Sequence, residues 1–208
     1  MKLTHEKYLK LLDYTKPLNS VATAVAHPCD EFSLKGVAEA AKLGIVVPIL
    51  TGPEKRIRAE ADRAGIDISD FELENAPHSH AAAERAVQLV HEGRAECLMK
   101  GSLHTDELLG AVVSSSKGLR TERRLSHCFV MDVPSYSETL IISDAAVNIA
   151  PTLADKMDIV QNAIDLAHAI RFKEVRVAIL SAMETVNPNI NSTIEAAALC
   201  KMADRKQI

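Results

Sequence analysis

Short apolar runs alternate along the chain with segments in which apolar residues repeat at helical spacing. Strands that are covered on both faces are apolar throughout, whereas the helices that cover them are apolar on one side only. The alternation therefore predicts an α/β fold with a mostly parallel sheet between helices. The expected strands are residues 21–26, 45–50, 96–99, 128–133, 139–143 and 175–180.

Several segments have the spacing of amphipathic helices, because their apolar residues recur about one helical turn apart. This spacing groups Leu3, Tyr8, Leu11 and Leu12 in the first helix, Ala83, Ala86, Val87 and Val90 on one face of the second, Met157, Val160, Ile164 and Ala167 on the inner face of the third, and Ile194, Ala197, Ala198 and Met202 in the last.

The connection between residues 128–133 and 139–143 breaks the alternation. Residues 135–138 are too few for a helical crossover, so the two strands should be antiparallel neighbours. We therefore expect a mixed sheet. A domain boundary is expected near Pro134, with a first α/β domain at residues 1–133 and a second, incomplete one at residues 134–208.

Composition and charge exclude several classes of function. A net charge of −4 provides no basic field for nucleic acid or anionic lipid, and a chain with 3% aromatic residues and no Trp offers no base-stacking platform. The cysteines lack C-x-x-C spacing, which predicts neither a zinc site nor a disulfide framework. The N-terminal segment has no uninterrupted apolar stretch, so we expect neither a signal peptide nor a membrane span. We expect the protein to be cytoplasmic.

Candidate binding residues come directly after the predicted strands. In open α/β sheets ligands bind at the carboxyl ends of strands, where loops converge and helix N-termini present free N–H groups. This rule selects residues 27–30, 51–53, 100–105, 143–148 and 181–184.

Residues 100–105, which we call the 100–105 loop, have the strongest chemical pattern. Lys100 supplies a point charge, Gly101 allows close approach to a ligand, and Ser102 or Thr105 can cap the following helix. Together they predict a phosphate cradle, although an ordinary N-cap turn with a solvated lysine explains the same spacing. Neither a Walker loop nor a G-x-G-x-x-G motif is present, which argues against nucleoside triphosphates and dinucleotides.

A basic run follows that loop. Arg120 beside Thr121 is a candidate phosphate contact, because a guanidinium forms bidentate hydrogen bonds with phosphate. Arg123 and Arg124 are interpreted as solvated loop residues.

Asp144 and Asn148 follow a predicted strand among small residues. Their side chains could bind a ligand, or they could satisfy the backbone of the turn, as such residues commonly do.

The remaining histidines and cysteines give weaker signals. His80 and Glu84 have the i, i+4 spacing of a metal-ligand pair, but no third ligand accompanies them, so no metal is expected. His104 and His127 could contact substrate or make structural hydrogen bonds. Cys29 and Cys128 are expected to be small buried residues and not nucleophiles.

Several long motifs, in this order, carry a family resemblance. They are LMKGSLHTDELLGAVV, GLRT, LSHCFVMDVP, LIISDAAVNIAPTL, KMDIVQNAIDLA, VAILSAMETVNPNINST and AAALCKMADR. From about residue 23 to its last residues the chain resembles the phosphate acetyltransferase and phosphate butyryltransferase family. The resemblance is closest to the butyryltransferase-like branch, which includes proteins named bifunctional enoyl-CoA hydratase/phosphate acetyltransferase. No segment corresponds to a hydratase module.

The resemblance implies a two-domain, three-layer α/β/α fold similar to isocitrate and isopropylmalate dehydrogenases, usually dimeric. It implies the reaction of a short-chain acyl-CoA with phosphate to give an acyl phosphate and free coenzyme A, with coenzyme A as a substrate and no metal or other cofactor. The family's substrate-binding positions map onto Lys100, Gly101, Ser102, Thr105, Arg120, Thr121, Asp144, Asn148 and Ser181, the last in a strand that lines the cleft.

The family pattern continues beyond residue 208, where the resemblance places its catalytic base and an arginine. We therefore expect the second domain to be incomplete and the chain to self-associate through an exposed sheet edge. The 208-residue chain alone should show little acyl transfer. Two alternatives stay open: a fragment that binds coenzyme A or phosphate without turnover, and a decarboxylating dehydrogenase of the same fold, for which the required aspartate cluster is missing.

Overall fold

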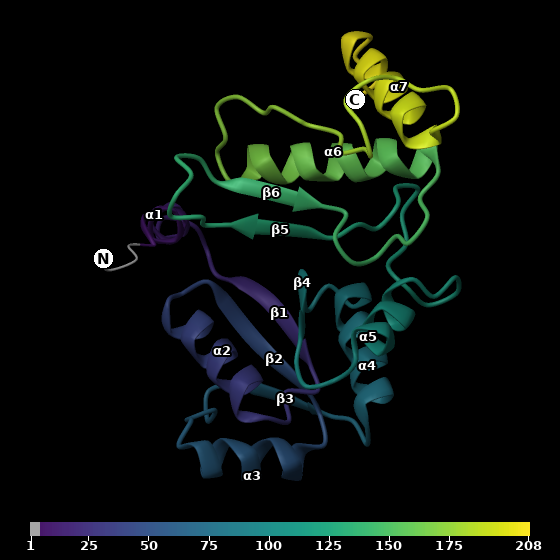
Figure 1. The fold of residues 1–208 in the computed structure, drawn as a ribbon. Helices are drawn as coiled ribbons and strands as arrows, with labels where there is room; N and C mark the ends of the chain where they lie inside the picture. Colours follow the sequence, from purple (N-terminus) through teal and green to yellow (C-terminus); the bar gives the residue numbers. More distant parts are fainter. Residues whose placement is uncertain (1–4) are drawn as a thin grey trace. The chain divides into compact units, whose positions relative to one another are not determined.

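A computed structural model describes residues 5–208 and divides the chain into two compact units. One comprises Leu12–Thr121 and is called here the sheet unit; the other combines Met1–Leu11 with Glu122–Ile208 and is called the hairpin unit. Each is described by itself (Figure 1). Helix α1 (Glu6–Thr15) contains the division. The helix predicted from the spacing of Tyr8, Leu11 and Leu12 is confirmed, although it buries none of its residues, and Leu3 lies outside the described residues.

The sheet unit alternates strands and helices, and its four strands are all parallel, in the order β3-β2-β1-β4. Its elements are β1 (Val21–Ala26), α2 (Glu31–Lys42), β2 (Val46–Gly52), α3 (Glu54–Ala64), β3 (Glu72–Asn75), α4 (Ser79–His91), β4 (Cys97–Lys100) and α5 (Thr105–Val112).

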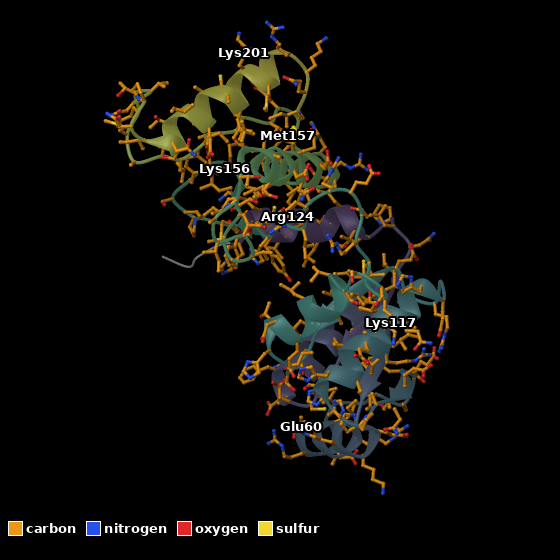
Figure 2. All side chains as sticks on the ribbon, turned by 90° about the vertical axis from the view of Figure 1, so that its right-hand side faces the viewer. Glu60, Lys117, Arg124, Lys156, Met157 and Lys201 are labelled. Atoms are coloured by element: carbon orange, nitrogen blue, oxygen red, sulfur yellow. The ribbon has the colours of Figure 1, made fainter. Side chains whose placement is uncertain are left out.

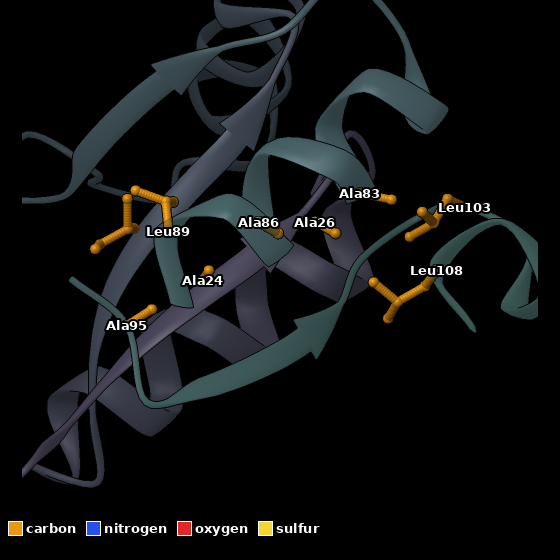
Figure 3. Close-up of a cluster of buried hydrophobic side chains, with 9 residues drawn as sticks. Ala24, Ala26, Ala83, Ala86, Leu89, Ala95, Leu103 and Leu108 are labelled. Atoms are coloured by element: carbon orange, nitrogen blue, oxygen red, sulfur yellow. The ribbon is translucent and has the colours of Figure 1, made fainter. Parts of the chain in front are cut away.

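Helices cover both faces of this sheet. Successive side chains of β1 point to opposite faces, so they pack against different helices. Ala24 and Ala26 pack in one cluster with residues of α4 and α5, as Figure 3 shows. Val25, between them, packs in a second cluster with residues of α2 and α3. The predicted interior face of α4 is confirmed, since Ala83, Ala86 and Val87 are buried.

Between residues 122 and 208 the hairpin unit has two antiparallel strands and two helices. They are β5 (Cys128–Met131), β6 (Leu140–Ser143), α6 (Leu153–Ala169) and α7 (Asn191–Asp204). The strand register pairs Cys128 with Ser143. Thr152 caps α6 by accepting the Asp155 N–H, and an ion pair of Lys156 with Glu195 joins α6 to α7; Figure 2 labels Lys156.

The α/β class and the antiparallel neighbours at β5 and β6 are confirmed. The single mixed sheet is not, because β5 and β6 form a two-stranded sheet of their own within residues 5–208. Residues 175–180 form no strand: a strand requires a ladder partner, and the described residues offer none beside this segment.

Two other expectations differ from the structure. The polar edge strand β3 was missed, because Glu72 and Glu74 interrupt any apolar run there. The alanine-rich helix α7 buries Thr193 and Leu199 and not the predicted face, since its sequence has little contrast between sides. The domain boundary at residues 133 and 134 stays a prediction. None of the helices described has the length and apolar character needed to span a membrane.

Candidate functional site

The strand order of the sheet unit creates one position that favours ligand binding. From β1 the chain first builds β2 and β3 on one side, and then places β4 on the other side of β1. The loops after β1 and β4 therefore lead to helices on opposite faces of the sheet, α2 and α5. Open α/β sheets bind ligands at such a switch point. Residues 27–30 and the 100–105 loop follow these two strands, in which Ala26 is aligned with Lys100.

Backbone hydrogen bonds join the two loops directly. The N–H groups of Gly101 and Ser102 donate to the carbonyls of Ala26 and His27, each over 2.9 Å. The Ser102 hydroxyl donates to the His27 carbonyl over 3.1 Å and accepts the Cys29 N–H over 3.2 Å. The hydroxyl predicted to bind phosphate thus already joins the two loops.

Gly101 is fixed by this close contact. A Cβ atom at this position would lie 2.5 Å from the Ala26 carbonyl oxygen and 2.6 Å from that of His27. Because nonbonded atoms do not approach so closely, the 100–105 loop can lie against β1 only with glycine here. The glycine predicted to allow close approach of a ligand instead allows close approach of the main chain at Ala26 and His27.

Two cationic side chains, Lys100 and Arg56, act on the carboxylate at the start of α2. Asp30 caps this helix by accepting the Ser33 N–H over 2.8 Å. The hydrogen bond from the Ser33 side chain lowers the pKa of Asp30 against the opposing effect of burial, and the charges of Lys100 and Arg56 lower that pKa further. Lys100 is exposed at the end of β4, so its ammonium can reach an anionic ligand at the switch point.

The start of α5 is closed by Glu107 and not by Ser102 or Thr105. The N-cap residue is His104, whose N–H donates to Glu107 over 2.7 Å. The other carboxylate oxygen accepts the Ser79 hydroxyl over 2.6 Å and lies 2.9 Å from His80 Nδ1. Thr105 is the first residue of the helix and is exposed, as are Arg120 and Thr121 in the segment after α5.

The thiol of Cys29 is buried at the switch point, as predicted for this residue. Burial raises its pKa to about 11, although Arg56 opposes that shift. Since the thiolate is the reactive form and Cys29 is buried with a raised pKa, a disulfide reagent at pH 8 should modify the exposed Cys97 and Cys200 at least about tenfold faster than Cys29. Peptide mass mapping over time checks this, with denatured protein as the control; early labelling of Cys29 would contradict the assignment.

In the hairpin unit, Asp144 organises the turn that follows β6. Its carboxylate accepts the backbone N–H groups of His127 over 2.9 Å and Asn148 over 2.7 Å, and the Asn148 side-chain amide over 2.5 Å. Burial alone would raise the pKa of Asp144, but the hydrogen bonds from Asn148 and His127 outweigh it and lower the pKa. These contacts are those of a turn-forming residue.

Asn148 in turn fixes Arg124. The side-chain oxygen of Asn148 accepts a hydrogen bond from Arg124 Nε over 2.7 Å. The backbone N–H of Arg124 donates to the Asp158 carboxylate over 2.8 Å. Arg124, labelled in Figure 2, is an exposed loop residue as predicted, and these hydrogen bonds orient it. Its neighbour Arg123 is paired with Asp165 at 2.5 Å.

Ser181 lies in irregular structure and not in a strand, with its hydroxyl 2.8 Å from that of Ser192. Two buried side-chain atoms, His127 Nδ1 and Ser143 Oγ, have no hydrogen-bond partner within the described residues. No group of three or more His, Cys, Asp or Glu side chains between residues 5 and 208 could hold a metal ion.

The site residues named from the sequence therefore fall into both units. Lys100, Gly101 and Ser102 meet residues 27–30 at the switch point, and Asp144 meets Asn148. Sequence reasoning missed Arg124, because its partners Asn148 and Asp158 lie 24 and 34 residues away. It selected residues 27–30 but did not identify how His27 is held.

Known proteins resemble this chain over most of its length. A phosphate acetyltransferase from Rhizobium meliloti is 58% identical over 202 residues, which are 97% of this chain and 64% of the relative. A phosphate butyryltransferase from Clostridium acetobutylicum is 41% identical over 194 residues, covering 93% of this chain and 64% of the relative. The chain thus spans less than two thirds of the length of these curated relatives.

Solved structures agree in fold. A branched-chain phosphotransacylase from Enterococcus faecalis V583 has a TM-score of 0.69 and 27% identity, covering 86% of this chain and 62% of the other. A phosphotransacetylase from Streptococcus pyogenes has a TM-score of 0.75 over 96% of this chain and 70% of the other; at 17% identity it supports the fold alone. The family model described as "Phosphate acetyl/butaryl transferase" matches residues 78–208. The chain therefore belongs to the phosphate acetyltransferase and butyryltransferase family.

Proposed function

We propose that this protein acts in the transfer of a short acyl group between coenzyme A and inorganic phosphate, with an acyl phosphate as the other reactant. The observation that carries the proposal is the place of the 100–105 loop at the switch point of the parallel sheet, with the exposed cation Lys100 beside the start of α2. The family to which the chain belongs supports the same reaction.

The loop suits the phosphate-bearing end of a substrate. The Lys100 ammonium donates to the Gly101 carbonyl over 3.3 Å and acts on the charge of Asp30, and its exposed side chain can also pair with an anionic ligand. The Ser102 hydroxyl holds the 100–105 loop against residues 27–29 through its hydrogen bonds to His27 and Cys29. We propose that Ser102 contributes to phosphate binding by holding the loop in this position. Arg120, Thr121, Asn148 and Ser181 stay proposed binding residues, and Asp144 is proposed to hold Asn148.

We further propose that the protein is cytoplasmic and forms a homodimer or larger self-association. Exposed apolar side chains on the β5–β6 hairpin support association, since Phe129 is 49% and Ile142 48% exposed. The domains at residues 1–133 and 134–208 belong to the same proposal. Coenzyme A is proposed as a substrate, with no metal or other cofactor.

Lys100→Ala tests the proposed function. Removing one charge-assisted contact should weaken the affinity for inorganic phosphate about tenfold. Lys35→Ala, which removes an exposed lysine on α2, should change it less than about twofold. Calorimetry with phosphate and with coenzyme A measures both variants.

A thioester assay with butyryl or acetyl phosphate and coenzyme A completes the test. Binding of coenzyme A and phosphate, with the loss confined to Lys100→Ala, would support the proposal, whereas a chain that binds neither would contradict it. Rapid thioester formation by the 208-residue chain would contradict the separate expectation that this chain alone turns over little.

A further inference from the structure

His27 is a buried ionisable residue to which the proposed function gives no role. Only 6% of its surface is exposed, and it follows β1 at the switch point. Its φ of 53° lies in the left-handed region, which residues other than glycine seldom adopt. Its N–H donates to the Thr51 carbonyl over 2.7 Å, so the main chain is anchored in this conformation. Such conformations persist where surrounding structure enforces them, and they cluster at functional sites.

The tautomer of the His27 ring follows from the hydrogen bond that its Nδ1 makes with Ser102. Nδ1 lies 3.0 Å from the carbonyl oxygen of Ser102. A carbonyl oxygen can only accept, so Nδ1 carries the proton and donates. In the neutral imidazole the other nitrogen, Nε2, then holds a lone pair and is an acceptor.

That acceptor lacks a partner and is not sealed off. No hydrogen bond to Nε2 occurs among residues 5–208, and Nε2 is not one of the two buried atoms without a partner, which are His127 Nδ1 and Ser143 Oγ. Part of the small exposed surface of His27 therefore belongs to Nε2. A side chain so deeply buried, held by its other nitrogen and presenting a lone pair at a switch point, is arranged to receive a donor from a ligand.

We propose that His27 is a ligand-binding residue whose Nε2 accepts a hydrogen bond from an N–H group of coenzyme A. The inference rests on the proposed function, because that function supplies coenzyme A as the ligand. Coenzyme A has such donors in its pantetheine amides and in its adenine amino group.

His27→Asn separates this role from a structural one. Asparagine tolerates the left-handed conformation better than most residues, and its side-chain nitrogen can replace Nδ1 as the donor to Ser102, but it has no atom in place of Nε2. We expect its melting temperature to stay within about 3 °C of the wild type. Its affinity for coenzyme A should fall about tenfold, the usual consequence of losing one hydrogen bond in a site.

The control is His91→Asn, because His91 is in the same unit and its Nε2 bonds to the Lys117 carbonyl, away from the switch point. It should bind coenzyme A as the wild type does. Calorimetry with pantetheine and with adenosine 3′,5′-bisphosphate identifies the donor: loss of pantetheine affinity in His27→Asn assigns the amides, and loss of bisphosphate affinity assigns the adenine.

Unchanged coenzyme A affinity in a folded His27→Asn variant would overturn the inference. The proposed function would still stand if the wild-type protein binds coenzyme A. If the variant does not fold, ¹⁵N spectroscopy of the wild-type histidines decides. Coenzyme A should then shift the Nε2 resonance of His27 and leave its Nδ1 protonated. An unmoved Nε2 resonance, or a proton on Nε2 in the free protein, would overturn the inference. Absence of any coenzyme A binding by the wild type would contradict the proposed function itself.

Discussion

Gly101→Ala should lower the free energy of unfolding of the sheet unit by about 3 kcal/mol, at the upper end of what inserting a methyl group into a packed site costs. The added Cβ would lie 2.5 and 2.6 Å from two carbonyl oxygens, and these belong to main chain next to β1 that cannot rotate away as a side chain can. To relieve the overlap, the 100–105 loop must move from β1 and lengthen the bonds of Ser102 to His27 and Cys29. Denaturant unfolding followed by circular dichroism measures the change.

Gly110→Ala is the matched control, because it adds the same methyl group only nine residues along the chain. Gly110 lies inside α5, is exposed, and has nothing within 4 Å of the position of a Cβ atom. Alanine favours helix over glycine by about 0.5–1 kcal/mol, so this variant should be more stable than the wild type. If Gly101→Ala were as stable as Gly110→Ala, the close approach of the loop to β1 would be wrong.

The contrast between these two glycines shows how far the sequence could predict the site. The apolar strands and the rule for carboxyl ends were enough to select residues 27–30 and 100–105. The use of Gly101 and Ser102 depends on the register that aligns Ala26 with Lys100. That register brings together residues about 75 positions apart, as in the bond from His27 to Ser102, and no local pattern reports it.

The strands show the same limit. Val21–Ala26 was predicted with its observed bounds because a central strand of a parallel sheet is apolar throughout. An edge strand such as Glu72–Asn75 needs no apolar run, and its Glu74 carboxylate pairs instead with Arg85 and Arg94. Residues 175–180 have the composition of a strand, yet composition does not supply a neighbour for hydrogen bonding. The apolar central strand was predictable from its sequence and the polar edge strand was not, whereas strand pairing was predictable only across the short connection between β5 and β6.

Asp144→Asn should lower the free energy of unfolding by about 2 kcal/mol at pH 7, because hydrogen bonds to a charged acceptor are worth more than those to a neutral one. The charged carboxylate accepts from His127 and Asn148, which hold the start of β5 beside the end of β6. An asparagine amide replaces one accepting oxygen with a donor, and that donor would face the N–H groups already there. The variant should also release Arg124, since Asn148 holds both residues.

The effect should depend on pH in a direction set by the lowered pKa of Asp144. In the unfolded chain the carboxyl titrates near its usual value of about 3.9, so its stabilising contribution is complete above about pH 4. It is lost as the pH falls through the lower pKa of the folded state, and the gap between wild type and Asp144→Asn should narrow there. Asp204→Asn, which removes only an exposed ion pair with Lys201, should cost less than about 0.5 kcal/mol at pH 7. Unfolding curves of the wild type and Asp144→Asn at pH 7 and pH 3 decide between the outcomes. A difference in stability as wide at pH 3 as at pH 7 would mean that the turn does not use the charge of Asp144. The hydrogen bonds of Asn148 would then have to hold the loop without that charge.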